Sequence, residues 1–329
     1  MGQRSKVLVT GVSGFTGSRL ARSLLERGYE VHGLVRASSR VGDLREQGVI
    51  LHQGDLGDGG SIESAMRGID AVYHIAASYR EGGLPEHEYY KVNVSGTRHV
   101  IEAALRHGVR RYIHCSTVGV HGHIEAPPAN EDAPFRPDDP YQKTKLQAEE
   151  LVRQYMGAGL PAVIFRPVGI YGPGDTRFLK LFRAINRGRF VMFGTGEVLY
   201  HLTYIDDLTR GILACGESDR ALGKTFIIAG EKAVTLNVLV EQIATLLGVK
   251  KPSLHVPFWL LWSSSIMCEA LCRPLRIRPP LYRRRAEFFV KDRAFDGSKI
   301  EHELGFKPAV ALEEGLRRTV AWYREQQLL

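Results

Sequence analysis

A glycine-rich turn near the N-terminus constrains the fold of this chain more than any other feature. The apolar run 7–10 predicts a β-strand, and Gly11, Gly14 and Gly17 follow it at intervals of three residues, where a helix is predicted to begin. The first glycine permits a tight turn, the second lets a pyrophosphate approach the backbone, and the third lets helix and strand pack closely. N–H groups at the start of the helix would face the phosphate. The turn therefore predicts a dinucleotide site that also includes Ser13, Phe15 and Thr16.

Strand and helix signals alternate through the first half of the chain. Helices are predicted over 89–107 and 141–156, and strands over 7–10, 29–35, 49–51, 71–75, 112–115 and 162–166. This alternation predicts an α/β fold, a doubly wound parallel sheet (Rossmann-type) with helices on both faces. The second half lacks the alternation and predicts a smaller, discontinuous C-terminal substrate domain. We expect a dinucleotide-binding domain over 1–167, with returning segments near 200–230, and the substrate domain mainly over 168–199 and 231–329.

The composition of the chain limits which classes of protein and which binding partners are expected. Hydrophobic residues make up 44% of the 329 residues and charged residues 24%, which is typical of a folded protein and excludes intrinsic disorder. The net charge of +8 favours an anionic partner such as a phosphorylated cofactor or an acidic membrane surface. No nucleic-acid module is present, so no nucleic-acid partner is predicted. The four cysteines indicate neither a metal site nor a disulfide framework.

The ends and the apolar runs of the chain predict its location. The N-terminus is polar and runs straight into the first strand, without the pattern of a signal peptide. The longest apolar run, 256–268, is shorter than the roughly 20 residues that span a bilayer. We therefore expect a cytoplasmic protein, with association at a membrane surface as an open alternative.

The end of the second predicted strand bears on the choice of cofactor. Sites selective for NAD place an acidic residue there to bind the ribose 2′-hydroxyl, whereas this chain has Arg36, Ser39 and Arg40. Arginines and serines suit a 2′-phosphate, so NADP is favoured over NAD. The alternative is an ordinary solvated basic loop.

A tyrosine and a lysine at helical spacing are candidate catalytic residues. Tyr141 and Lys145 are four residues apart in a predicted helix and therefore share a face. A nearby ammonium group stabilises a phenolate and lowers the pKa of the tyrosine from its ordinary value near 10. Ser116 and Thr117 follow the fifth predicted strand, so their hydroxyls lie at the carboxyl edge of the sheet, where ligands bind.

Taken together, these motifs closely resemble those of the extended short-chain dehydrogenases/reductases, and the resemblance extends over nearly the whole chain. The matching stretches are 10–17, 54–56, 74–77, 93–97, 115–117, 141–145 and 166–173. The resemblance implies that Tyr141 is the general acid/base, that Lys145 lowers its pKa and binds the nicotinamide ribose, and that Thr117, or alternatively Ser116, holds the substrate oxygen. It also implies further cofactor contacts at Asp55, Leu56, Ala76, Ala77, Asn93 and Pro167. For Asn93, a helix-start cap is the alternative.

Two positions bear on the substrate. Nucleotide-sugar epimerases and dehydratases usually carry an asparagine and an arginine that bind the substrate diphosphate, where this chain has Gly169 and Tyr200. Arg177 or Arg183 could substitute for them. An apolar, aromatic-rich segment stands at 255–268, followed by arginines up to Arg285, and it resembles the 3β-hydroxysteroid and sterol-carboxylate dehydrogenase branch. The segment 255–285 is interpreted as a substrate lid, a membrane contact or ordinary packing.

The sequence therefore predicts an NAD(P)-dependent oxidoreductase that acts on a secondary alcohol or ketone of an apolar, sterol- or triterpenoid-like substrate. Two alternatives remain: a nucleotide-sugar epimerase or dehydratase that retains NAD, and a regulatory protein that senses the cofactor on the same fold. The resemblance further implies a homodimer.

Overall fold

The structure is a computed structural model of the chain, and it describes all residues except 1–3, 80–84, 273, 275–276 and 278. The predicted Arg273, Arg276 and Arg278 of the basic stretch lie outside the described residues, as do the side chains of Arg284 and Arg285.

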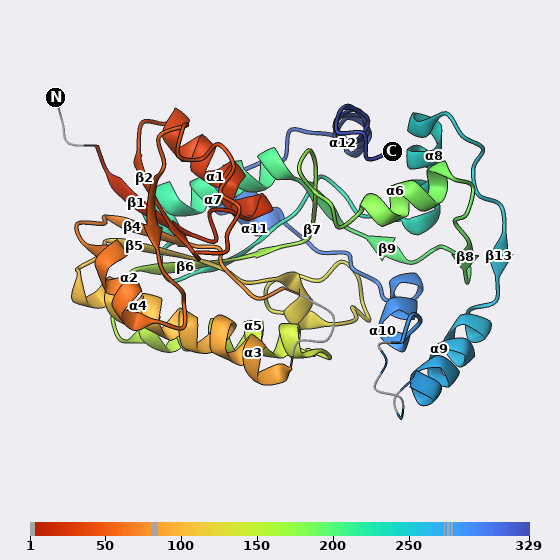
Figure 1. The fold of residues 1–329 in the computed structure, drawn as a ribbon, viewed down its shortest axis with the longest axis horizontal. Coiled ribbons are helices and arrows are strands. Elements are labelled where there is room, and N and C mark those ends of the chain that lie inside the picture. Colours follow the sequence, from red (N-terminus) through yellow and green to blue (C-terminus); the bar gives the residue numbers. More distant parts are fainter. Residues whose placement is uncertain (1–3, 80–84, 273, 275–276, 278) are drawn as a thin grey trace.

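A seven-stranded parallel sheet forms the centre of the molecule (Figure 1). Its strand order is β11-β6-β5-β4-β1-β2-β3, and every neighbouring pair is parallel. This confirms the doubly wound sheet, and the six predicted strands are all present. The strands are β1 (Lys6–Thr10), β2 (Glu30–Val35), β3 (Ile50–Gln53), β4 (Ala71–His74), β5 (Arg111–Cys115), β6 (Ala162–Pro167) and β11 (Thr225–Ile228).

Helices cover both faces of the sheet (Figure 1). One layer contains α1 (Phe15–Glu26), α7 (Ile205–Glu217) and α11 (Ser298–Leu304), and the other contains α2 (Gly59–Met66), α4 (Gly96–Arg106) and α5 (Pro140–Gly157). A short 3-10 turn, η3 (Asp219–Ala221), leads from α7 to β11. The strand β11 was not predicted; it brings the chain back to the sheet from the second half and pairs with β6.

The long helix predicted over 89–107 is interrupted in the structure. It consists of α3 (Glu86–Tyr90), a π-helical turn, η1 (Lys91–Ser95), and α4. A π turn inserts one extra residue per turn and frequently marks a functional site. The hydrophobic pattern of the segment gives no signal of this insertion.

The second half builds short two-stranded sheets and helices at one end of the molecule. The strand pairs are β7 (Gly169–Tyr171) with β10 (Leu202–Tyr204), β9 (Leu199–Tyr200) with β12 (Val234–Thr235), and β8 (Met192–Phe193) with β13 (His255–Val256). The helices are α6 (Leu179–Asn186), α8 (Leu236–Leu247) and α12 (Leu312–Glu325). One hydrophobic core continues from the sheet into this half, from Val9 and Phe165 to Leu239 and Tyr323.

Both ends of α8 follow the sequence signals. The Thr235 side chain accepts a hydrogen bond from the N–H of Val238, and Gly248 ends the helix in the left-handed conformation with φ +75°.

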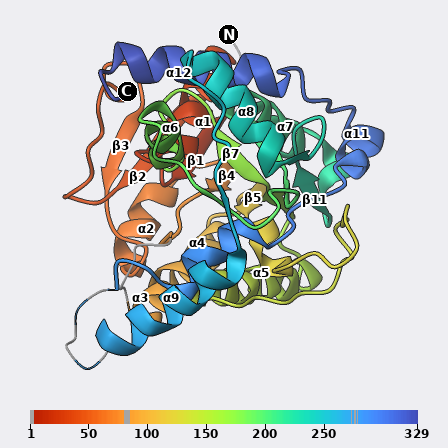
Figure 2. The same cartoon turned by 90° about the vertical axis from the view of Figure 1, so that its right-hand side faces the viewer.

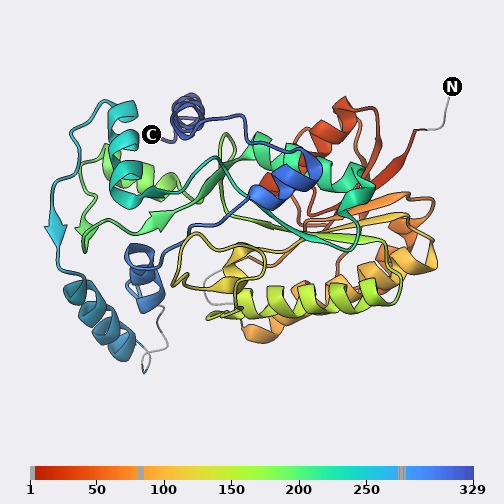
Figure 3. The ribbon, with the colours of Figure 1, turned by 180° about the vertical axis from the view of Figure 1, so that it is seen from behind.

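The apolar segment forms a separate helix, α9 (Phe258–Cys272), followed by α10 (Arg283–Ala286) and the 3-10 turn η4 (Glu287–Phe289). Figures 1 and 3 place α9 at the end of the molecule remote from the N-terminus. Viewed toward that end (Figure 2), α12 and α8 lie at the top and α9 at the bottom.

Candidate active site

The predicted site residues meet at the carboxyl edge of the central sheet. Gly11 follows β1, Arg36 follows β2 and Asp55 comes two residues after β3, while Ser116 follows β5 and Pro167 is the last residue of β6. Because all these strands are parallel, their ends lie along one edge, where α/β folds bind ligands.

The glycine turn after β1 leaves no room for side chains. Gly11 has φ +71°, and a Cβ there would lie 2.8 Å from the backbone of Ala76. A Cβ on Gly17 would lie 2.1 Å from the carbonyl oxygen of Gly11. Gly14 caps α1 without a side-chain hydrogen bond, and the first turn of α1 carries no acidic residue. These features fit the pyrophosphate of a dinucleotide, which the N–H groups of that first turn can bind.

The loop after β2 brings together residues that are predicted to bind the 2′-phosphate of NADP. The N–H of Ser39 donates to the carbonyl of Arg36 at 2.9 Å, and the N–H of Arg36 donates to the Ser39 hydroxyl at 3.1 Å. Arg36 and Arg40 are both exposed. After β3, Asp55 uses its carboxylate to accept the N–H of Gly57 at 2.8 Å, so this side chain stabilises its own turn.

Asn93 joins the segment after β4 to α5, the helix that carries Tyr141. It lies in the π turn η1 and is 1% exposed. Its Oδ1 accepts the N–H of Ser78 at 2.7 Å, and its Nδ2 donates to the Thr144 hydroxyl at 3.0 Å. It is therefore not a helix-start cap. The contact with Thr144, the residue before Lys145, links α5 to the segment that contains Ala76 and Ala77.

Tyr141 and Lys145 lie on the first turns of α5, which Asp139 caps by accepting the N–H of Gln142 at 2.9 Å. Tyr141 is 7% exposed and Lys145 is 2% exposed. The Nζ of Lys145 donates to the carbonyl of Cys115 at 2.5 Å. Burial lowers the pKa of Lys145. An ammonium group on the same helix face as a phenol stabilises its phenolate, so this pair can exchange a proton with a bound alcohol or ketone.

The two hydroxyls after β5 have different hydrogen-bond partners and different exposure. The Ser116 hydroxyl donates to the Glu149 carboxylate at 2.6 Å and is buried beneath the site. The Thr117 hydroxyl accepts the N–H of Gly119 at 3.0 Å, at the start of the 3-10 turn η2 (Val118–His121), and Thr117 is partly exposed. Its own proton remains able to bind a ligand oxygen. Of these two residues, Thr117 is the one that is partly accessible to solvent.

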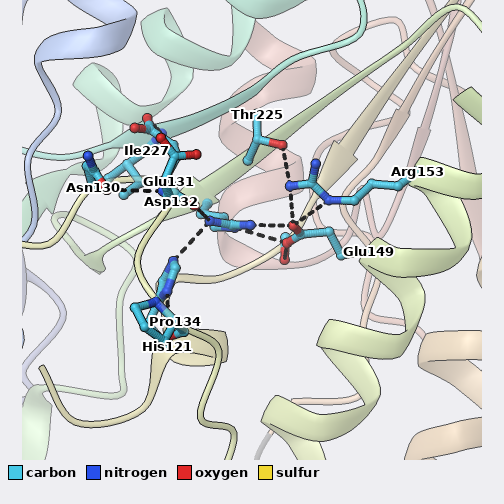
Figure 4. Close-up of polar contacts among 11 residues, drawn as sticks. His121, Asn130, Glu131, Asp132, Pro134, Glu149, Arg153, Thr225 and Ile227 are labelled. Atoms are coloured by element: carbon cyan, nitrogen blue, oxygen red, sulfur yellow. Dashed lines mark hydrogen bonds and ion pairs between the residues drawn. The ribbon is translucent and has the colours of Figure 1, made fainter.

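A buried ion pair supports this edge of the sheet from below (Figure 4). Glu149 and Arg166 are both fully buried, and Arg166 donates to both carboxylate oxygens, at 2.5 and 3.1 Å. Arg166 also donates to the carbonyl of Glu131 at 2.8 Å, and Arg153 links Glu149 to Thr225. The hydrogen bonds from Arg166 and Ser116 lower the pKa of the Glu149 carboxyl, although burial opposes this shift. Glu149 lies one turn beyond Lys145, so the pair fixes α5 to β5 and β6.

Arg177 lies near two aromatic rings, those of Phe15 at the start of α1 and of Tyr79. Its guanidinium carbon is 5.3 Å from the centroid of the Phe15 ring and 5.9 Å from that of Tyr79. The Tyr79 ring packs edge-on against Tyr141, with centroids 5.0 Å apart. Asp175, which is buried, accepts the Nε–H of Arg177 at 2.6 Å. Arg183 instead donates to the carbonyl of Leu328, at the C-terminus.

One residue near the predicted substrate positions was not identified from the sequence. Arg293 donates to the Tyr200 hydroxyl at 3.0 Å and lies over its ring, with the guanidinium carbon 5.3 Å from the centroid. Tyr200 occupies the position expected from the sequence, and a guanidinium group reaches its ring from elsewhere in the chain. Arg293 follows Tyr200 by more than ninety residues, and no local pattern signals the contact. Gly169 lies against β10, where its N–H donates to the carbonyl of His201 at 3.2 Å.

Comparison with known proteins identifies the family. Residues 7–229 match the model of the NAD dependent epimerase/dehydratase family. The 2-alkyl-3-oxoalkanoate reductase of Stenotrophomonas maltophilia is 33% identical over 330 residues, covering 96% of this chain and 98% of the reductase. Sterol demethylase protein B of Methylococcus capsulatus is 31% identical over 332 residues, covering 98% of this chain and 99% of that protein.

A solved structure of similar fold contains a nicotinamide dinucleotide, NAD. DesIV, a dTDP-glucose 4,6-dehydratase from Streptomyces venezuelae determined with NAD bound, superimposes with a TM-score of 0.80 at 28% identity, and the match covers 98% of each chain. The glycine turn, the parallel sheet and the tyrosine–lysine helix agree with this similarity. This chain is an enzyme of the NAD dependent epimerase/dehydratase family, the extended short-chain dehydrogenases/reductases.

Proposed function

We propose that this enzyme interconverts a secondary alcohol and its ketone on an apolar substrate, with NADP as the hydride carrier. The observation that carries the proposal is the buried pair Tyr141 and Lys145, anchored at the end of β5 beside the glycine turn. When bound, NADP accepts or supplies the hydride. Residues 1–167, with the returning segments near 200–230, bind the cofactor, and 168–199 and 231–329 mainly cover the substrate.

Three side chains of the site act on the substrate oxygen or on the group that exchanges its proton. In the oxidation direction, the Tyr141 oxygen takes the proton of the alcohol, and in reduction it returns a proton to the oxygen of the former ketone. Lys145 stabilises the phenolate electrostatically. Thr117 donates its hydroxyl proton to the substrate oxygen and orients it. A positioned acid/base of this kind contributes about a hundredfold to ten-thousandfold in rate.

The loop after β2 supports NADP rather than NAD as the cofactor. Arg36, Ser39 and Arg40 gather at the end of β2, and neither Arg36 nor Arg40 has a carboxylate partner among the contacts of the described residues. A 2′-phosphate placed there gains charge-assisted hydrogen bonds.

Two relatives support an apolar substrate, because their names refer to an alkyl-substituted oxoalkanoate and to a sterol. The ketone of an oxoalkanoate is also the functional group that the tyrosine–lysine pair can protonate. By resemblance to the family, we further propose a cytoplasmic homodimer.

Arg293 and Arg177 give a specific reason to test the nucleotide-sugar alternative. Arg293 contacts Tyr200 and Arg177 lies near Tyr79, and either guanidinium group could bind a diphosphate. The test is a thermal melt of the NADP-loaded protein with sterol-like alcohols and with nucleotide sugars, because a ligand that binds the folded state raises Tm. Stabilisation by the apolar alcohols supports the proposal. Stabilisation by a nucleotide sugar alone would replace it with an epimerase or dehydratase function.

A further inference from the structure

Helix α9 (Phe258–Cys272) presents a broad apolar face to solvent. Among its residues only Leu261 and Ser265 are buried. Trp259 is 64% exposed, Met267 is 61% exposed and Leu271 is 64% exposed. Among the described elements, none exposes as many large hydrophobic side chains as α9 does. A protein surface of this kind usually marks an interaction site.

These exposed side chains lie on one side of the helix. Trp259 precedes Ile266 and Met267 by seven and eight residues, and Leu271 follows Met267 by four, so all four project from one face. The other exposed residues of α9 are Leu260, Ser263, Ser264 and Ala270. The exposed face of α9 therefore contains no charged residue. This is unusual for a helix face that contacts only solvent.

The one charged side chain of α9 is neutralised by a neighbour. Glu269 is partly buried and accepts the Nε–H of Arg283 at 2.9 Å and the N–H of Arg283 at 2.8 Å. This ion pair fastens α10 to α9. It also removes the negative charge that would otherwise repel an anionic surface.

Positive charge is concentrated in the chain that follows α9. The stretch 273–285 contains six arginines and no acidic residue. Arg283 is exposed and joins this stretch to α9. In the sequence, this positively charged stretch begins at the residue directly after the last residue of α9.

We propose that the exposed face of α9 docks on the surface of an anionic lipid membrane. An apolar helix face inserts at the boundary between headgroups and acyl chains, and each arginine near anionic lipid adds to the attraction. Trp259 has the amphipathic ring that favours this boundary. The contact is peripheral, since no described helix is long and apolar enough to cross a membrane. A second copy of the chain is a poorer partner, because pairing α9 with itself would bring two arginine stretches together.

The proposal is tested by flotation of the full-length protein with vesicles, in the absence of substrate and cofactor. Vesicles of phosphatidylcholine with phosphatidylglycerol are compared with vesicles of phosphatidylcholine alone. We expect binding to the anionic vesicles that is about tenfold or more tighter and that weakens as salt is raised. Failure to bind the anionic vesicles would overturn the proposal. Because no turnover is measured, the result does not depend on the proposed reaction.

Two variants locate the contact on α9. The double variant Trp259→Ser/Met267→Ser should bind anionic vesicles about tenfold or more weakly, because it removes apolar area from the exposed face. The matched control Val238→Ser, at a side chain 40% exposed on α8, should bind as the wild type does. Ile266→Ser serves as a second test if the double variant melts at a lower temperature.

Two further outcomes would replace the membrane with another occupant of the same face. If the double variant converts a wild-type dimer into a monomer in analytical ultracentrifugation, the face is a contact between copies of the chain. If the wild type does not bind vesicles and the double variant loses affinity for an apolar ligand, the exposed face of α9 is part of the substrate site.

Discussion

The ammonium nitrogen of Lys145 lies 2.5 Å from the carbonyl oxygen of Cys115, so the lysine of α5 is bound to the last residue of β5. Thr117 follows two residues later, and Tyr141 stands one helical turn before the lysine. This one contact therefore sets the position of the three proposed catalytic groups relative to one another. The Asn93 bridge and the buried Glu149–Arg166 pair fix α5 from two other directions.

Replacement of Tyr141 by phenylalanine should abolish proton transfer while leaving the cofactor site intact. We expect Tyr141→Phe to lose about a hundredfold or more in kcat with little change in the Kd for NADP, because the ring remains and only the hydroxyl is lost. Steady-state turnover and cofactor titration measure the two quantities. Tyr155→Phe is the control, since that hydroxyl lies further along α5 and bonds Glu102 at 3.2 Å. Turnover near the wild-type level in Tyr141→Phe would exclude the tyrosine as acid/base.

Replacement of Arg36 should change cofactor preference. Arg36→Ala should weaken NADP binding by about tenfold or more and leave NAD binding nearly unchanged, because a hydrogen bond to a charged group contributes about 1.5–3 kcal/mol. Titration of both cofactors into both proteins measures this. Arg45→Ala, another exposed arginine on the same connection, should leave both constants unchanged. Tighter binding of NAD than of NADP by the wild type would contradict the proposed cofactor.

The buried ion pair below the site should be costly to break. Glu149→Gln leaves the fully buried Arg166 without its charged partner, and we expect the free energy of unfolding to fall by about 3–5 kcal/mol. Urea denaturation measures the change. The neighbouring exposed Glu150 provides the control, because Glu150→Gln should stay within about 0.5 kcal/mol of the wild type. Equal stability of the two variants would show that the pair does not hold α5 in place.

Two buried histidines should make the fold sensitive to acid. Burial lowers the pKa of His74 to about 3 and lowers that of His114 well below its usual range. The unfolded chain therefore binds more protons than the folded one below about pH 6.5, and stability is lost as the pH falls, by up to about 1.4 kcal/mol per pH unit for each histidine. Denaturation midpoints across this range measure the slope.

The contribution of His114 can be isolated because neither of its ring nitrogens has a hydrogen-bond partner among the described residues. His114→Phe removes this unsatisfied polar ring and should stabilise the protein and reduce its loss of stability in acid. His123→Asn, at an exposed histidine, should leave the slope as in the wild type. A slope in His114→Phe as steep as that of the wild type would contradict the assignment.

The sheet could be predicted from the sequence because its strands carry local signals. Each of β1 to β6 is a short apolar run, and several are bounded by glycines at helix ends, such as Gly28 and Gly108, both of which have positive φ. The seventh strand, β11, lies in the irregular second half, where α7 and the 3-10 turn η3 separate it from the three-residue strand β10. Its pairing with β6 is a tertiary contact that the pattern of residues does not encode locally.

The candidate site shows the same division between local and tertiary information. The glycine turn and the Tyr141–Lys145 spacing are local, and the structure brings them to one edge of the sheet. The choice between Ser116 and Thr117 depends on the buried Glu149, which binds the Ser116 hydroxyl. The positive charge beside Tyr200 comes from Arg293, which is far from Tyr200 in the sequence. The apolar character of α9 is visible in the sequence, but its exposure depends on how the helix packs.

The most direct test of the proposed function is the stoichiometry of the cofactor. The enzyme is incubated with NADPH and an apolar ketone, such as a 3-ketosteroid, and the alcohol formed is counted against the NADPH oxidised. We expect one NADPH to be consumed for each alcohol produced, and this reaction to be lost in Tyr141→Phe. Conversion of a nucleotide sugar without net consumption of cofactor, together with no reaction on apolar ketones, would contradict it.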